Sequence, residues 1–177
     1  MEMFVAVFNP IVGVSVIAMQ IAIVCILVVL LGKHAPTLRW IGKWKKELLL
    51  AVSGIALAGS LTYSYIIGFT ACYLCWIQRL LIVPPLVIAA ISIARKSANR
   101  TAVKWSLPFI GIGTIVAIYH TLIQNGIGTG NALCQAVGGT SCTQLYVNEF
   151  GYITIPVMSL TVFVLLLLIS LVKTPKQ

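Results

Sequence analysis

Long apolar stretches alternate with short polar segments along this chain. Five stretches contain no Asp, Glu, Lys or Arg: 11–31, 48–78, 80–94, 105–148 and 150–172. A helix that spans a membrane needs about 20 apolar residues. The pattern therefore predicts five spanning helices, at about 10–32, 48–69, from around Cys72 to 94, 105–126 and 152–172.

The composition favours a membrane protein over a soluble one. Of the 177 residues, 60% are hydrophobic and only 8% are charged, whereas a typical soluble domain has roughly 45–50% apolar residues. A soluble fold of this length could not bury so much apolar surface. We expect an all-α membrane protein in which residues 1–177 form a single integral membrane domain.

The positions of the basic residues predict the orientation of the helices. The net charge is +9, but eleven of the twelve basic residues lie in three segments: 33–46, 95–104 and 173–177. Basic residues concentrate on the cytoplasmic side of membrane proteins, so we expect basic loops and the C-terminus in the cytoplasm and the N-terminus outside. This distribution does not indicate binding to nucleic acid.

Individual residues within the helices predict local structure. Pro10 and Pro156 are expected in the first turns of the first and fifth helices, where proline is tolerated. Gly54 and Gly59, with small neighbours, predict close approach of the second helix to others. Cys25 has no cysteine at a matching depth and is expected to be a packed, apolar thiol.

The remaining four cysteines form two pairs on the predicted outer side. Cys72 and Cys75 form a C-x-x-C motif at the predicted start of the third helix, where a thiolate is stabilised. Cys134 and Cys142 lie in the glycine-rich segment 127–150. Two structural disulfides are an alternative, but C-x-x-C closes too small a ring to stabilise the fold much. The C-x7-C spacing of the second pair does not favour zinc, so we expect no metal.

Three polar residues are predicted one to two helical turns below the C-x-x-C motif. Arg79 is four residues after Cys75 and shares its helical face, and a charge at that depth indicates a functional site. Gln78 precedes it, and His120 is expected at a similar depth on another helix. The alternatives are an arginine that reaches back to the interface and polar groups that only join helices. Arg79, Gln78 and His120 together form a polar layer that is suited to binding the carbonyl group of an oxidised, lipid-soluble carrier.

Several motifs together resemble one known family. They are C-x-x-C-x-x-Gln-Arg at 72–79, Tyr119-His120, the Cys134/Cys142 segment and the block FGYITIPVMSL at 150–160. This combination resembles the DsbB/BdbC family of membrane thiol–quinone oxidoreductases over about residues 48–172. The resemblance implies a four-helix transmembrane bundle over 48–172, to which the helix at 10–32 is an extra N-terminal transmembrane helix. It also implies a prokaryotic cell (inner) membrane location.

The resemblance implies roles for the site residues. Cys134 and Cys142 would face a DsbA-like, thioredoxin-fold partner outside the membrane, and Cys72 and Cys75 would pass electrons to a quinone (ubiquinone or menaquinone). Arg79 would sit at the quinone head with Gln78 and His120 nearby. We expect the partner to attack an accessible sulfur of a mobile loop, which then moves to the first pair. The protein would thus be a disulfide-forming oxidoreductase in contact with membrane lipid.

Two other functions remain open from the sequence. A vitamin K epoxide reductase-like quinone reductase uses similar groups, but in that family the loop cysteines precede C-x-x-C, whereas here they follow it. A non-enzymatic membrane scaffold with structural disulfides is the second alternative.

Only seven residues separate Cys134 from Cys142, which is shorter than in enterobacterial DsbB proteins and closer to the Gram-positive type.

Overall fold

The structure is a computed structural model that describes residues 2–32, 35–127, 134 and 140–172. All regular elements in these residues are helical. In chain order they are α1 Glu2–Leu31, α2 Ala35–Lys43, α3 Lys45–Leu61, the π-helix η1 Thr62–Ile66, α4 Tyr73–Ala94, α5 Asn99–Gln124 and α7 Ile155–Leu171.

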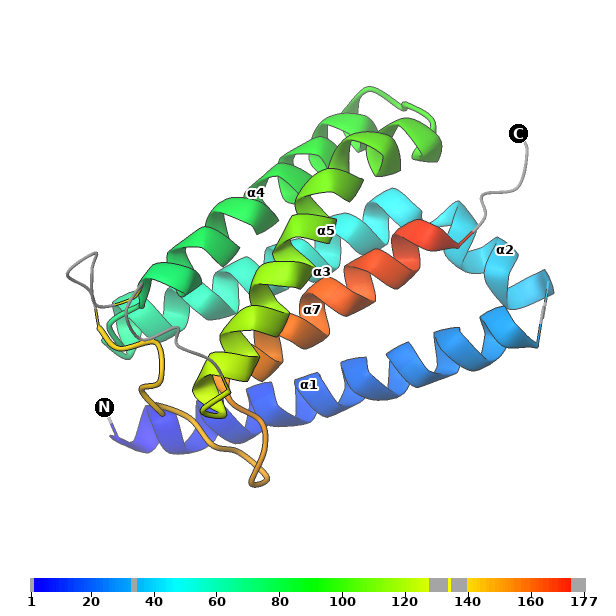
Figure 1. The fold of residues 1–177 in the computed structure, drawn as a ribbon. Coiled ribbons are helices and arrows are strands. Elements are labelled where there is room, and N and C mark those ends of the chain that lie inside the picture. The colour runs from blue at the N-terminus through cyan, green and yellow to red at the C-terminus, as the bar shows by residue number, and fades with distance from the viewer. Residues whose placement is uncertain (1, 33–34, 128–133, 135–139, 173–177) are drawn as a thin grey trace.

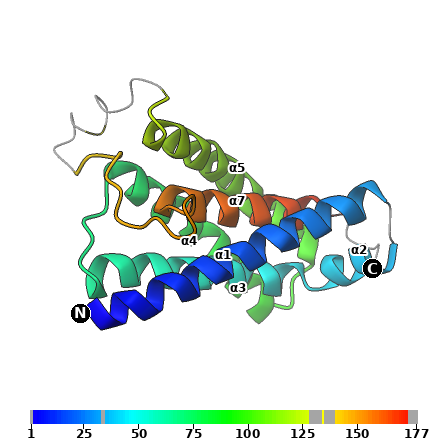
Figure 2. The same cartoon turned by 90° about the horizontal axis from the view of Figure 1, so that it is seen from below.

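Four of these helices form a bundle, and α1 lies along its outside. α4 packs between α3 and α5, α5 packs against α7, and α7 also contacts α3. α1 packs mainly against α7 and crosses the bundle obliquely (Figures 1 and 2). The core between the four helices includes Leu49, Ile82, Ile110 and Leu166. The prediction of an all-α bundle with one extra N-terminal helix is confirmed.

The helices have the length and composition of membrane spans. Four are long and apolar enough to cross a membrane: Val5–Leu31, Lys45–Ile66, Tyr73–Ala94 and Asn99–Gln124. The fifth, α7, is apolar but has 17 residues, which is at the short end of the usual range for a spanning helix. The chain is therefore a multi-pass membrane protein.

Some boundaries differ from the prediction. α1 begins at Glu2, so Pro10 lies inside the helix and not in its first turn. The reason is that residues 3–8 are also apolar and continue the helix. α5 begins at Asn99 and not near 105, whereas α7 does contain Pro156 in its first turn, as predicted.

The predicted basic loop 33–46 contains a helix, α2, within its described part. Its Ile41 is buried and Leu38 packs on the same cluster, so the segment is held by an apolar contact with the bundle. Trp40 and Trp44 remain exposed, as expected for side chains at the headgroup level.

The described basic segments gather at one end of the bundle. Asn99 Nδ2 donates to the carbonyls of Gly42 and Lys43, both at 2.9 Å. The buried Lys45 Nζ donates to the carbonyl of Ser170 at 2.9 Å and to that of Val172, at the end of α7. The N-terminus lies at the opposite end (Figure 1).

Two packing predictions are wrong or only partly right. Cys25 is exposed, because α1 packs on the bundle along one side only and Cys25 lies beside other exposed residues, Ile21 and Val24. Gly54 does approach α4, since an added Cβ would lie 3.5 Å from Leu86 Cδ1. Gly59, however, faces open space.

Candidate active site

The first cysteine pair forms the start of α4. Cys72 is the N-cap residue, and its sulfur accepts a hydrogen bond from the backbone N–H of Cys75 at 3.4 Å. The two sulfurs lie 2.9 Å apart and are not bonded as a disulfide. The hydrogen bond from the Cys75 thiol lowers the pKa of Cys72 most; burial raises it, and His120 lowers it further, so that the pKa lies well below its ordinary value. Cys72 is therefore poised as a thiolate.

The second pair is a disulfide that packs against the first pair. Cys134 and Cys142 are bonded, with their Cα atoms 6.0 Å apart. They share a buried cluster with Cys72, Leu74 and Ile123. The sulfurs of Cys72 and Cys142 and a ring nitrogen of His120 all lie within 4.8 Å of one another. The sulfur of Cys142 is thus next to the sulfur of Cys72.

The burial of the Cys134 and Cys142 sulfurs differs from the expectation of an accessible loop. Cys134 and Cys142 are 1% and 2% exposed, so neither sulfur is open to a protein partner in this state. Cys142 also needs no loop movement to approach Cys72. Residues 128–133 and 135–139, which include all four glycines of the predicted glycine-rich segment 127–150, lie outside the described residues.

His120 connects the cysteines to Gln78. His120 Nε2 lies 3.6 Å from the sulfur of Cys72, and Gln78 Nε2 lies 3.3 Å from His120 Nδ1. All three residues are buried. When the Gln78 amide donates to Nδ1, a neutral imidazole carries its proton on Nε2 and donates it to the Cys72 sulfur. The predicted polar layer therefore includes a hydrogen-bonded chain from Gln78 to Cys72.

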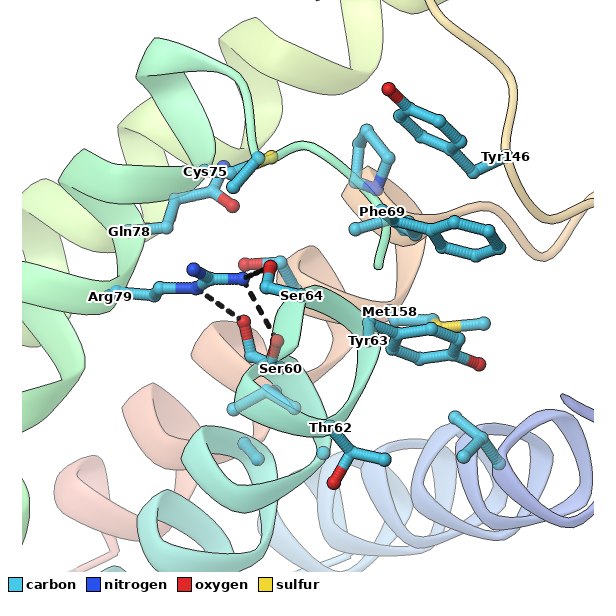
Figure 3. A pocket seen from close by; sticks show the side chains of 18 of the residues that line it. Ser60, Thr62, Tyr63, Ser64, Phe69, Cys75, Gln78, Arg79, Tyr146 and Met158 are labelled. Carbon is cyan, nitrogen blue, oxygen red and sulfur yellow. Dashed lines mark hydrogen bonds between the residues drawn. The ribbon is translucent and has the colours of Figure 1, made fainter. Parts of the chain in front are cut away.

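Arg79 is buried and held by two serines of the second spanning segment (Figure 3). Its Nε donates to Ser60 Oγ at 2.8 Å, and its Nη2 donates to the Ser60 carbonyl at 2.8 Å and to Ser64 Oγ. The guanidinium carbon lies 5.0 Å from the ring centroid of Trp76. Nη1 has no hydrogen-bond partner among the described residues. Arg79 thus points into the bundle and does not reach back to the interface.

The serine partners of Arg79 were not identified from the sequence as site residues. Ser64 lies in η1, where the backbone N–H of Ile67 donates to the carbonyl of Thr62, five residues earlier. Short π-helical segments often occur at functional sites. The available signal was the pair of hydroxyls four residues apart in an apolar segment.

A cavity of about 680 Å³ adjoins these groups. Its volume is typical of a small-molecule site. Cys75, Gln78, Arg79 and His120 line one part of it, whereas most other lining residues are apolar and come from α1, α3, η1 and α7. Gly59 also lines it, so this small residue leaves space for a cavity and does not bring two helices together.

Comparison with known proteins identifies the family. The sequence model of the family "Disulfide bond formation protein DsbB" matches residues 43–173. The chain belongs to the DsbB family. No solved structure is matched by the chain at a significant level.

Relatives of the DsbB-family chain carry names of the same kind. "Probable disulfide formation protein C" of Bacillus cereus is 36% identical over 136 residues, which are 74% of this chain and 96% of the relative. "Disulfide bond formation protein C" of Bacillus subtilis is 38% identical over 117 residues, which are 66% and 83% of the two chains. "Probable disulfide formation protein" of Oceanobacillus iheyensis is 34% identical over 131 residues, which are 70% and 83%.

The family match and the geometry bear on the alternative functions. DsbB-family membership indicates a disulfide-forming oxidoreductase and favours neither a vitamin K epoxide reductase-like enzyme nor a scaffold. Cys72, His120 and Cys142 have the geometry of possible metal ligands, but a sulfur in a disulfide is not the thiolate that zinc binds. That the DsbB-family protein uses no metal stays a prediction.

Proposed function

We propose that this protein is a thiol:quinone oxidoreductase that reoxidises a DsbA-like, thioredoxin-fold thiol oxidase outside the membrane. The observation that carries the proposal is the contact between the two cysteine pairs beside a largely apolar cavity. The sulfurs of Cys142 and Cys72 lie within 4.8 Å, and both Cys75 and Arg79 line the cavity. Sulfur chemistry and a site for a lipid-soluble molecule therefore adjoin each other.

The first exchange takes place between the partner and the Cys134–Cys142 disulfide. A partner thiolate attacks the sulfur of Cys134, forming a mixed disulfide and releasing Cys142 as a thiolate. The second partner thiol then displaces Cys134, so the partner leaves as a disulfide. Because Cys134 is buried, its surroundings must open for this step. Exchange requires access to the attacked sulfur.

The second exchange moves the electrons to the first pair. With Cys72 and Cys75 oxidised to a disulfide, the Cys142 thiolate attacks the neighbouring sulfur of Cys72 and releases Cys75 as a thiolate. The thiol of Cys134 then attacks Cys142, restoring the Cys134–Cys142 disulfide and releasing Cys72. The net result is one oxidised partner and the reduced Cys72/Cys75 pair, which is the state that the structure describes.

Cys72 is a good leaving group in this last step. A thiolate of low pKa leaves faster in thiol–disulfide exchange, and the hydrogen bonds to Cys72 lower its pKa. His120 contributes one of these hydrogen bonds, and Gln78 orients the imidazole. We propose that His120 and Gln78 act on Cys72 in addition to lying near the acceptor.

The acceptor site fits a quinone (ubiquinone or menaquinone). A quinone bound there would supply an acceptor of two electrons and two protons, and Cys72 and Cys75 would return to a disulfide. Quinone oxygens are hydrogen-bond acceptors. Nη1 of buried Arg79, which has no hydrogen-bond partner in the part of the chain that the structure describes, is a donor on a residue that lines the cavity. Arg79 would hold the head group, with Gln78 and His120 beside it. Arg79 would also stabilise negative charge on sulfur and on the acceptor.

The arrangement of charges supports the proposed topology. Hydrogen bonds join the segment 42–46 to the segments 97–99 and 170–172 at one end of the bundle. The described basic residues of the two basic loops lie in or close to the segments 42–46 and 97–99. We propose that this end is cytoplasmic in a prokaryotic cell membrane. The N-terminus and both cysteine pairs then lie on the outer side, where a thiol oxidase partner can reach them.

Purified protein tests the proposal directly. A reduced thioredoxin-fold donor and a quinone are added, and reduction of the quinone is followed. We expect turnover by the wild type and loss of turnover in Cys75→Ala and in Cys134→Ala. Cys25→Ala is the matched control and should keep wild-type turnover. A wild type that exchanges disulfides with the donor but reduces no quinone would contradict the proposed acceptor.

A further inference from the structure

The first helix lies outside the family match but lines the cavity. The DsbB sequence model begins at residue 43, whereas α1 ends at Leu31. Six α1 residues line the cavity, and they follow the helical spacing i, i+3, i+4, i+7, i+8 and i+11: Phe8, Ile11, Val12, Ser15, Val16 and Met19. This spacing places them on one face of the helix. That face of α1 is therefore directed at the cavity.

Hydrogen bonds hold α1 against the bundle near both ends of this face. The hydroxyl of Tyr63, in η1, donates to Asn9 Oδ1 at 3.2 Å. Further along α1, Gln20 Nε2 donates to Thr161 Oγ1 at 3.4 Å, and the hydroxyl of Tyr152 donates to Gln20 Oε1 at 2.8 Å. Polar side chains that pair between helices hold membrane bundles together. Asn9 and Gln20 thus fix α1 at two heights.

A close approach supports the same docking. A Cβ atom added at Gly13 would lie 2.9 Å from Phe150 Cε2 and 3.3 Å from Glu149 Cβ. The absence of a side chain at Gly13 lets the segment before α7 reach the α1 backbone. α1 is thus fitted to the bundle and is more than a membrane anchor attached by a linker.

The position of α1 closes one side of the cavity. The other lining residues on this side come from α3 and α7, among them Ala56, Gly59, Met158 and Ser159. α1 crosses α3 and α7 in the view from below (Figure 2). Without α1, this side of the cavity would be bounded by lipid.

We propose that α1 is a wall of the acceptor site and that its face from Ile11 to Met19 limits the size of the lipophilic acceptor. This inference rests on the proposed function, which assigns the cavity to a quinone. The head group would lie by Arg79, and the apolar substituents would contact α1. Binding of a quinone is then sensitive to side-chain volume on one face of α1 and insensitive to it on the opposite face.

A pair of adjacent substitutions tests the inference. Ser15 lines the cavity, whereas the adjacent Val14 does not. Ser15→Phe adds volume toward the cavity, and Val14→Phe adds a similar ring on the outer face. Quinone binding is measured by quenching of Trp76, which packs on Arg79. We expect Ser15→Phe to weaken binding roughly 10-fold, the effect of forcing extra volume into an occupied site, and Val14→Phe to bind as the wild type.

Two further readouts separate the possible outcomes. Reduction of the Cys134–Cys142 disulfide by a dithiol donor should proceed at the wild-type rate in both variants, which reports that they are folded. In the wild type, a quinone with a photoreactive group on its apolar substituent should label an α1 peptide that contains residues 11–19. Equal quinone binding by both variants, or labelling of α3, α4 and α7 alone, would overturn the inference. A wild type that binds no quinone would instead overturn the proposed function.

Discussion

The sulfur of Cys142 lies within 4.8 Å of the sulfur of Cys72. The two residues are 70 positions apart in the sequence, and both are buried. Because disulfide exchange proceeds by attack of one sulfur on another, this contact supports the proposal that Cys142 communicates with the first pair. In that proposal Cys134 is the sulfur that the partner attacks.

The contact predicts which mixed disulfide can be trapped. In the double variant Cys75→Ser/Cys134→Ser, only Cys72 and Cys142 remain of the two pairs. We expect mild oxidation to join them efficiently, because their sulfurs are already close. The product is measured by mass spectrometry of peptides under non-reducing conditions.

The matched control keeps the other cysteine of the second pair. Cys75→Ser/Cys142→Ser leaves Cys72 and Cys134, and we expect at least several-fold less crosslink under the same conditions. Equal yields from the two double variants would show that the second pair has no preferred orientation toward Cys72.

The lowered pKa of Cys72 predicts a pH dependence for the reduced first pair. A thiol is deprotonated at pH values above its pKa. Because the pKa of Cys72 is lowered, Cys72 is a thiolate from that lowered pKa upward, including the range below about 8.5 in which an ordinary thiol is still protonated. Ultraviolet absorbance of the thiolate, measured in Cys134→Ser/Cys142→Ser after reduction, should therefore persist well below the ordinary titration range. The same titration after Cys72→Ser gives the baseline.

His120 should contribute only part of this effect. His120→Asn removes the hydrogen bond from His120 to Cys72 but leaves the hydrogen bond from Cys75, which is the largest cause of the lowered pKa. We expect the thiolate titration to move to higher pH but to stay below the ordinary range. An unchanged titration would contradict the role given to His120.

The sequence predicted the helices because the apolar runs have the length of a membrane span. It did not predict α2, because basic residues dominate that segment and its apolar contact rests on Leu38 and Ile41 alone. The start of α4 was predicted correctly at the first cysteines. The start of α1 was not, because residues 3–8 carry no signal that ends a helix.

The structure brings together the cysteine pairs, Gln78, Arg79 and His120, which the sequence singled out, but the sequence did not predict the contacts between them. Arg79 was identified because a charge in an apolar helix is costly. Its partners on another helix, Ser60 and Ser64, depend on how α3 and η1 pack against α4, which no local pattern encodes. The choice of Cys142 as the neighbour of Cys72 depends on tertiary packing in the same way.

Loss of the Arg79 side chain should weaken quinone binding and spare the exchange with the partner. In Arg79→Ala we expect the KM for quinone to rise roughly 10- to 100-fold, the range of a lost hydrogen bond to a charged group. Reduction of Cys134–Cys142 by the donor in the absence of quinone should be unchanged. Steady-state quinone reduction and single-turnover exchange measure the two effects separately.

An arginine at the other end of the same helix serves as the control. Arg95 is exposed at the C-terminal end of α4, and Arg95→Ala should leave the KM for quinone unchanged. If Arg79→Ala behaves as Arg95→Ala does, Arg79 is not part of the acceptor site.

The contact between Gly113 and Phe163 predicts that the bundle does not tolerate a larger side chain at position 113. A Cβ atom added at Gly113 would overlap the ring of Phe163, with Cδ1 and Cζ only 2.6 Å away, and Phe163 is 1% exposed, so its ring cannot move aside easily. We expect Gly113→Ala to destabilise the protein by about 1–3 kcal/mol, as overpacking of a core does. Thermal unfolding in detergent measures the change.

Gly111 gives a control on the same helix, since an added Cβ there meets nothing within 4 Å. Gly111→Ala should leave the unfolding temperature unchanged or raise it, because alanine favours a helix over glycine by about 1 kcal/mol. Adding Phe163→Leu to Gly113→Ala makes room for the new methyl group and should restore part of the lost stability. Equal unfolding temperatures for the two alanine variants would mean that α5 and α7 are not held at the close distance that Gly113 permits.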